Sequence, residues 1–157
     1  MEIYSRNPYP AGKLSNFTSF KFVLDGIECG SMEGFLQALK FENVSSQQAT
    51  AKLSGYTAKK KGSARNKFWT SKQCLWWNGI EYNRKSFEYQ NLLNRAYNAL
   101  YEQNESFRKC LDDAGNAKFT HSMGNKNKKE TCLTRSEFCG RLQHLKDVGL
   151  LPVMEMI

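Results

Sequence analysis

The sequence predicts a compact, mainly α-helical α+β domain with a small β-hairpin near its N-terminus. Two observations predict this fold class. Several segments carry apolar residues at helical spacing, and the clearest of them runs over residues 86–102. An Asp25-Gly26 pair lies between two β-rich runs, which is typical of a tight hairpin. At 157 residues and 40% hydrophobic composition, the chain suits a single domain over 1–157, with its core in about 9–149.

The first half of the chain predicts two helices after the hairpin. Turn-forming residues over 7–17 indicate a loop. Ser31 can cap a helix over residues 32–41, because a serine oxygen can accept from the free N–H groups of the first turn. A second helix is expected to begin near Ser46 and to fray into the basic stretch that follows.

The second half predicts three further helices. An Asn78-Gly79 turn indicates either a second hairpin or an extended loop. The helix over 86–102 follows, and a shorter helix ends at Gly115. Residues 117–124 have strand or extended character. A capping-box pattern over 134–137 then opens a last helix that closes at Gly149, and the apolar tail beyond it either packs on the body or frays.

Composition narrows the class of function. No apolar run reaches the roughly 18 residues of a membrane helix, so we expect no membrane partner. The N-terminus has no apolar signal-peptide region, and the odd number of cysteines, five, lacks a paired zinc-binding spacing. A reduced, cytoplasmic protein is the simplest interpretation, in the host cytoplasm if the source is a virus. No metal or cofactor is predicted.

Part of the net charge of +8 is concentrated in two stretches, residues 57–72 and 124–130. Clustered lysines and arginines attract phosphates, so a nucleic acid or a phosphorylated small molecule is a plausible partner. The alternative is a pair of solvated loops that keep the protein soluble.

A polar stripe in the predicted 32–41 helix is the main candidate for chemistry. Glu33, Gln37 and Lys40 follow one another at i, i+4 and i+7, with apolar residues on both flanks. A simple intrahelical ladder would explain the spacing, but not the apolar flanks. In a partly buried stripe, the carboxylate can move a proton or stabilise a cation, and the lysine can act as an amine nucleophile.

Two other features are candidates for a binding site. Trp76 and Trp77 are adjacent, so they cannot share one face of a strand, and one of them could be exposed for stacking on a base. Burial of both in the core is the equal alternative. Of the two histidines, His144 fits packing or surface, while His121 before a glycine turn fits a site or a structural role equally well.

Several of these segments together resemble the NADAR superfamily, the YbiA-like group associated with NAD and ADP-ribose metabolism. The resemblance covers about Tyr9 to Lys146 and is carried by LSNF at 14–17, VLDG at 23–26, the E-x-x-x-Q-x-x-K-F helix at 33–41 and a tryptophan before an Asn-Gly turn. It implies a compact, mainly helical fold and an N-glycosidase. The implied substrate is an ADP-ribosylated base, such as guanine in nucleic acid, or a riboflavin-pathway-like ribosyl phosphate.

The resemblance also implies roles for individual residues. Glu33 corresponds to the essential carboxylate. Lys40 lies where a lysine is proposed to attack the ribose C1 as a Schiff base. Asn16, Phe17 and Trp77 would build the sugar and base pocket.

Gln37, His121 and Ser122 would supply hydrogen bonds in the same pocket. The acidic D-x-x-WG-like segment of many relatives has no counterpart here, and the THSMG run holds His121 and Ser122 in its place. The alternative function is a non-enzymatic protein that binds ADP-ribose-like ligands or nucleic acid.

Overall fold

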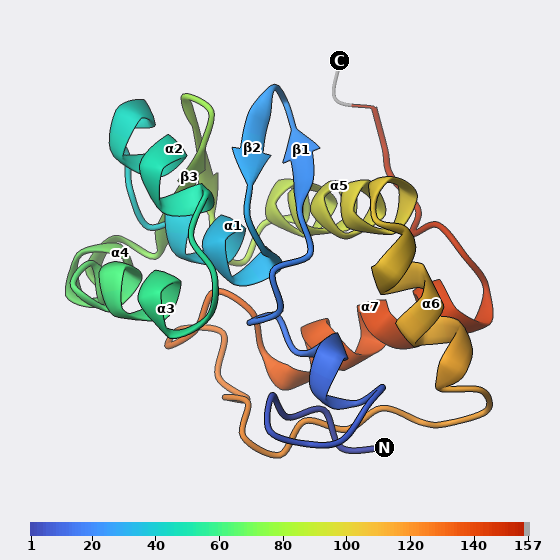
Figure 1. Cartoon of the computed structure of the whole chain (residues 1–157). Coiled ribbons are helices and arrows are strands. Elements are labelled where there is room, and N and C mark those ends of the chain that lie inside the picture. The colour runs from blue at the N-terminus through green and yellow to red at the C-terminus, as the bar shows by residue number, and fades with distance from the viewer. Residues whose placement is uncertain (156–157) are drawn as a thin grey trace.

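The computed structural model describes residues 1–155, and these confirm the predicted mainly α-helical α+β class. Seven α-helices, one 3-10 helix and two antiparallel two-stranded sheets make up this part of the chain (Figure 1). The elements in chain order are η1 (Gly12–Leu14), β1 (Phe22–Leu24), β2 (Ile27–Cys29), α1 (Met32–Ala38), α2 (Val44–Ala51), α3 (Gly55–Ser63), α4 (Asn66–Lys72), β3 (Cys74–Trp77), β4 (Ile80–Asn83), α5 (Phe87–Gln103), α6 (Glu105–Asp113) and α7 (Arg135–Asp147). None of these helices has the length and apolar character needed to span a bilayer.

Both Asn/Asp-Gly turns form β-hairpins. Asp25 and Gly26 join β1 to β2 with φ angles of 51° and 76°, the left-handed geometry that such two-residue turns require. Asn78 and Gly79 join β3 to β4 with φ angles of 50° and 85°. The open choice at residues 74–83 is therefore resolved in favour of a second hairpin.

Helix α1 is buried in the middle of the molecule, between the α2–α4 group and α5 (Figure 1). The predicted cap is confirmed, since the Gly34 N–H donates to the Ser31 Oγ at 2.9 Å. The predicted end at residue 41 is wrong, because the helix stops at Ala38. The Leu39 carbonyl accepts instead from the Trp76 N–H of β3 at 2.8 Å, so Lys40 lies just beyond the helix.

The basic stretch over residues 57–72 is helical, which corrects the expectation that helix α2 would fray into it. Helix α2 ends at Ala51, and Gly55, with a φ of +56°, starts a new helix. In α3 and α4, Ala58, Gly62 and Trp69 face inward and are buried, while the lysines point outward. Ala58 and Gly62 are four residues apart and therefore share one face of α3, while α4 buries Trp69.

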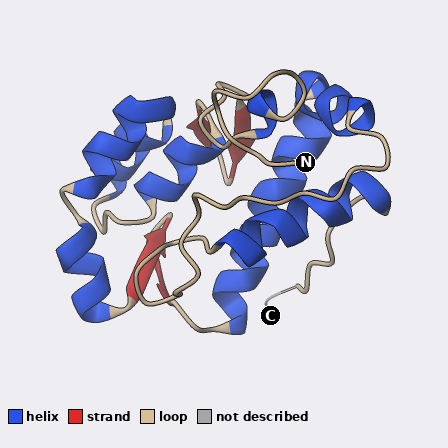
Figure 2. Cartoon of the chain, turned by 90° about the horizontal axis from the view of Figure 1, so that it is seen from below, coloured by secondary structure: helices blue, strands red, loops and turns tan. Residues whose placement is uncertain are grey.

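The C-terminal half agrees with the predicted helices, but not with the strand alternative at residues 117–124. The apolar face of α5 is buried, and the capping box between Thr134 and Glu137 opens α7 as expected. Residues 117–124 do not form a strand, since their one ladder contact is an isolated bridge from Thr120 to Glu2. The tail packs on α5 as far as Met154, whose N–H donates to the Asn91 Oδ1. Seen from below, irregular segments cross the molecule between the helices (Figure 2).

Candidate active site

A cleft of about 440 Å³ lies between α1, α3, the N-terminal loops at residues 4–5 and 15–17, and the loop over residues 121–133. That volume falls within the range of small-molecule and cofactor sites. Six of the eight predicted site residues line it, namely Asn16, Phe17, Glu33, Gln37, Lys40 and His121. Trp77 and Ser122 are not among its lining residues.

Glu33 lies in the first turn of α1, and the backbone positions it against the LSNF segment. Its N–H donates to the Asn16 carbonyl at 3.0 Å, which fastens the loop to the start of the helix. The Gln37 Nε2 donates to the Glu33 Oε1 at 2.8 Å. Burial raises the pKa of Glu33, and the Gln37 hydrogen bond and the charges of Lys40 and Lys59 oppose this only in part.

Gln37 is buried, and one polar atom of its side chain lacks a hydrogen-bond partner. Its Oε1 accepts no hydrogen bond from the residues that the structure describes. The amide lies directly against Gly62 of α3, where an added Cβ would come within 1.8 Å of that oxygen. A buried amide oxygen without a donor costs about 1–3 kcal/mol, so Gln37 is held in this position at a cost to stability.

Lys40 is 7% exposed and forms no ion pair with the described part of the chain. Its Nζ donates to the Asn66 Oδ1 at 2.6 Å. Burial lowers the pKa of Lys40, and the charge of Lys59 adds to this, while Cys132 and Glu33 oppose it. Glu33 and Lys40 are thus both pushed by burial toward their neutral forms.

Asn16 and Phe17 bring the LSNF segment to the cleft. The hydroxyl of Tyr97 on α5 donates to the Asn16 Oδ1 at 2.8 Å. The Asn16 Nδ2 is left to donate to a ligand. The Phe17 ring is partly buried, and the Lys59 Nζ lies 6.0 Å from its centroid.

His121 contributes an imidazole with one nitrogen already engaged. Its Nδ1 lies 2.7 Å from the Ile3 carbonyl oxygen, which fixes a proton on that nitrogen because a carbonyl only accepts. In the neutral ring, the lone pair is therefore on Nε2. The edge of the ring packs against Phe138 at 5.2 Å between centroids.

The structure separates two predicted residues from the cleft. Trp77 is 1% exposed, packs against Phe35 at 4.8 Å and donates its Nε1–H to the Asp25 Oδ2 at 3.0 Å. It therefore has no free face for a base, and the stacking role that the resemblance implied for Trp77 is corrected to a core role. Trp76 is also buried, so of the two alternatives for this pair the structure shows burial of both. Ser122 donates from both N and Oγ to the Glu2 carboxylate at 2.7 Å, which anchors the N-terminal segment.

Comparison with known proteins establishes the family. The family model described as bacteriophage protein GP30.3 matches residues 8–147. The chain belongs to this GP30.3 family. A relative in Enterobacteria phage T4, an uncharacterized 17.1 kDa protein of the Gp30–rIII intergenic region, is 35% identical over 148 residues, which cover 94% of this chain and 97% of the relative.

A solved structure confirms the YbiA-like fold that the resemblance predicted. The NMR structure of YbiA from E. coli matches with a TM-score of 0.59 and 17% identity, over 94% of this chain and 82% of YbiA. At that identity the likeness concerns the fold. The chemistry of this GP30.3 protein has to be argued from its own cleft.

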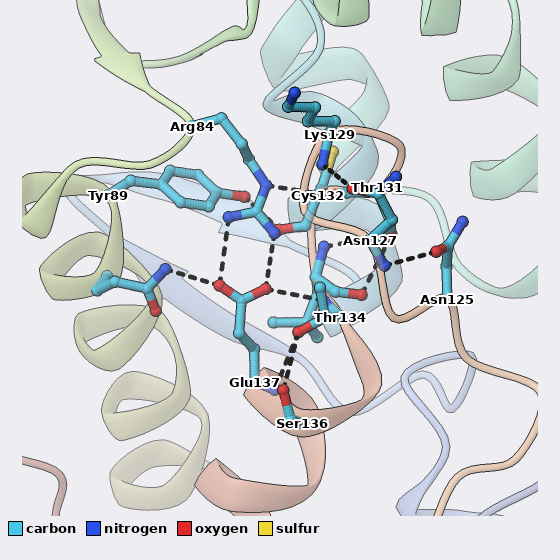
Figure 3. Close-up of polar contacts among 12 residues, drawn as sticks. Arg84, Tyr89, Asn125, Asn127, Lys129, Thr131, Cys132, Thr134, Ser136 and Glu137 are labelled. Atoms are coloured by element: carbon cyan, nitrogen blue, oxygen red, sulfur yellow. Dashed lines mark hydrogen bonds and ion pairs between the residues drawn. The ribbon is translucent and has the colours of Figure 1, made fainter.

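Sequence reasoning missed the side chains that hold this cleft in shape. Arg84, before α5, reaches Glu137 at the start of α7, and its Nε donates to the Thr131 carbonyl in the cleft wall at 2.8 Å (Figure 3). Asn66, which bonds Lys40, was also missed. The capping box pointed to Glu137, but nothing in the local sequence pairs it with an arginine 53 residues away.

Metal ligation has no evident place in this cleft. Among residues 1–155, no three His, Cys, Asp or Glu side chains converge in a way that could hold a metal ion. The polar groups that line the cleft are amides, hydroxyls, one imidazole, one thiol, two carboxylates and two lysines.

Proposed function

We propose that this GP30.3-family protein is an N-glycosidase that cleaves the bond between a base and a phosphorylated ribose, and that its substrate is an ADP-ribosylated base. One observation carries the proposal. A carboxylate and an amine, Glu33 and Lys40, are both desolvated at one wall of a cleft with room for a nucleotide. Glycosidic cleavage uses a carboxylate beside the sugar C1, because that carbon becomes cationic in the transition state.

Each group has a defined task in the reaction. The C1–N bond breaks, the base leaves with the electron pair and a proton, and water supplies the hydroxyl that replaces it. Glu33, as carboxylate, stabilises the cationic sugar or moves a proton of the water. Lys40 either holds a ribose or phosphate oxygen or adds to C1 before water does.

The remaining cleft residues provide recognition. Asn16, Gln37 and His121 offer hydrogen bonds to the sugar and base. Phe17 replaces Trp77 as the aromatic surface at the cleft. Lys59 and the neighbouring exposed lysines of α3 attract the pyrophosphate or a nucleic-acid backbone.

A second candidate function is binding of the same ligands without turnover. The observation that favours it is the exposed basic surface of α3, where Lys59, Lys60 and Lys61 follow one another and Lys59 lines the cleft. Such a surface binds phosphates whether or not chemistry follows.

A product assay tests the proposal. The panel holds guanine-ADP-ribosylated DNA and RNA, free ADP-ribose conjugates, NAD and ribosylated pyrimidine phosphates, and release of base or ADP-ribose is measured by chromatography. The variants are Glu33→Gln, which keeps an acceptor for Gln37, and Lys40→Met, which keeps the buried volume. Glu28→Gln on the exposed side of β2 is the matched control for loss of a carboxylate.

Wild type and Glu28→Gln are expected to release product, while Glu33→Gln and Lys40→Met lose it with an unchanged thermal unfolding midpoint. Full activity of Glu33→Gln would overturn the assignment. Tight binding without product across the panel would favour the binding function.

A further inference from the structure

Three cationic side chains are buried in the described part of the chain, Arg84, Arg141 and Lys40, and their hydrogen-bond partners differ. Arg84, which is fully buried, pairs with the Glu137 carboxylate through two hydrogen bonds. Lys40, almost as deeply buried, has only the neutral amide oxygen of Asn66 as a hydrogen-bond partner among the described residues. Arg141 has no ion pair in the described part of the chain either, but it donates three hydrogen bonds, to the carbonyl oxygens of Glu137 and Gln90 and to the Gln90 Oε1. With one neutral acceptor and no carboxylate of residues 1–155 within ion-pair distance, Lys40 is the buried cation whose desolvation is least offset.

Asn66 is held in the orientation that this contact requires. Its Oδ1 also accepts from the Nε1–H of Trp69 at 3.3 Å, and Trp69 is completely buried. Because an indole N–H only donates, it selects the oxygen rather than the nitrogen of the amide. The Nδ2 is therefore directed away, and Asn66 itself lines the cleft.

The start of α4 holds Lys40 at a second point. The Nε of Arg65 donates to the Lys40 carbonyl at 3.2 Å, while its guanidinium lies over the rings of Phe68 and Phe41. Arg65 and Asn66, at the start of α4, thus fix the backbone and the side-chain nitrogen of Lys40.

We infer that Asn66 is a positioning residue that holds the Lys40 amine in a fixed direction within the cleft while leaving it free to give up its proton. The role of the amine in turnover rests on the proposed function, but its positioning does not. A carboxylate at residue 66 would hold the proton on Lys40, and an apolar side chain would leave the amine without an acceptor.

The other charged and titratable groups around Lys40 do not replace Asn66 as the group that bonds the amine. Glu33 from α1 and Cys132 from the cleft loop favour the ammonium, whereas Lys59 from α3 opposes it. Arg65 from α4 is directed at the carbonyl, not at the amine. Asn66 is the group in hydrogen-bond contact with the nitrogen, so a change at this residue acts most directly.

The neutral amine has a defined reactivity that can be measured without any glycosidic substrate. One N–H bonds to Asn66, and the lone pair points elsewhere. The nitrogen adds to the carbonyl carbon of an aldehyde, water leaves and an iminium forms. Cyanoborohydride then delivers hydride to that carbon, which leaves a stable secondary amine on the lysine.

The experiment uses ribose 5-phosphate, whose open form is an aldehyde, with cyanoborohydride over pH 5 to 10, and peptide mass spectrometry quantifies labelling of Lys40. The exposed Lys60 is the internal reference. The variants are Asn66→Asp and Asn66→Leu, with Asn116→Asp, at an exposed position outside the cleft, as the matched charge control. Thermal unfolding verifies that each variant is folded.

In wild type and Asn116→Asp, Lys40 is expected to label at lower pH than Lys60. Asn66→Asp moves the Lys40 profile to higher pH, by about one pH unit or more, and Asn66→Leu moves it to lower pH. The inference is overturned if Lys40 labels with the profile of Lys60, or if the two variants leave its profile unchanged. Failure of base release in the product assay would leave these results intact, so the two proposals fail separately.

Discussion

Arg84 and Glu137 form a buried, bidentate ion pair behind the cleft wall. The Arg84 Nη2 donates to the Glu137 Oε1 at 2.7 Å, and Nη1 donates to Oε2 at 3.2 Å. The same carboxylate accepts from the Thr134 N–H, while the Arg84 Nε holds the Thr131 carbonyl (Figure 3). The pair therefore joins the chain before α5, the start of α7 and the loop that carries Thr131 and Cys132 into the cleft.

Replacing one member of this pair should destabilise the protein strongly. Arg84→Met leaves the Glu137 carboxylate buried without its partner, which costs about 3–5 kcal/mol in the free energy of unfolding. Denaturant titration measures this cost. The double variant Arg84→Met/Glu137→Leu is the control and should recover much of the stability, because no charge is left unpaired. A single variant within 1 kcal/mol of wild type would contradict the role of the pair.

The same pair predicts a dependence of stability on pH. Burial disfavours the Glu137 carboxylate, but hydrogen bonds from Arg84, Thr134 and Gln90 outweigh it and lower the pKa to about 2. Since the folded pKa lies below the unfolded value near 4.5, the contribution is present above about pH 4.5 and is lost as the pH falls toward 2. The stability difference between wild type and Glu137→Gln should therefore shrink between about pH 5 and pH 2. A constant difference over that range would contradict the assignment.

Gly62 packs directly against Gln37, so its replacement should disturb the wall of the cleft that holds Glu33 and Gln37. In Gly62→Ala, the new Cβ would lie 1.8 Å from the Gln37 Oε1 and 2.8 Å from its Cβ, so the Gln37 side chain has to shift, which disturbs its hydrogen bond to Glu33. We expect a loss of about 1–3 kcal/mol of stability together with most of the activity. Gly140→Ala in α7 is the control, since nothing lies near its Cβ, and it should be neutral or stabilise by about 0.5–1 kcal/mol. Equal effects of the two substitutions would disprove this packing.

Local sequence patterns predicted the elements whose cause is itself local. The Asp25-Gly26 turn, the Ser31 cap and the apolar face of α5 all depend on neighbours within one turn or hairpin, and all three are confirmed. The pairing of Glu33 with Gln37 in the polar stripe could also be predicted from the sequence, because the two residues are one helical turn apart. Helices α3 and α4, by contrast, were not predicted, because basic residues dominate their sequence and only a few inward residues pack on the core.

Long-range pairing accounts for what the sequence did not predict. Lys40 meets Asn66 across 26 residues, and Arg84 meets Glu137 across 53, so no spacing rule connects them. Helix α1 ends before Lys40 because the Leu39 carbonyl accepts a hydrogen bond from the Trp76 N–H of β3, which is also a contact between distant parts of the chain. The position of Trp77 was missed for the same reason, since its partner is Asp25 in a distant hairpin turn.

Trp77 should therefore matter for stability and not for ligand binding. Trp77→Phe removes the hydrogen bond to Asp25 and part of a core ring, which should cost about 1–3 kcal/mol in unfolding free energy. The affinity for ADP-ribose, measured by calorimetry at a temperature where the variant is fully folded, should stay within about twofold of wild type. Phe17→Ala, at the cleft, is the comparison and should weaken binding. Loss of affinity in the folded Trp77→Phe protein would restore the stacking role.

The basic surface beside the cleft should distinguish nucleic-acid-linked ligands from free ones. Lys60 and Lys61 are exposed on α3, next to the cleft residue Lys59 but outside the cleft. Replacing both by Gln should reduce the slope of log affinity against log salt by about 1.4 for single-stranded nucleic acid, because each phosphate contact adds about 0.7. Affinity for free ADP-ribose should change little. Lys21→Gln/Lys52→Gln, an exposed pair outside the cleft, is the charge-matched control. If that pair lowers the slope equally, the attraction comes from net charge alone and the surface beside the cleft has no special part in binding.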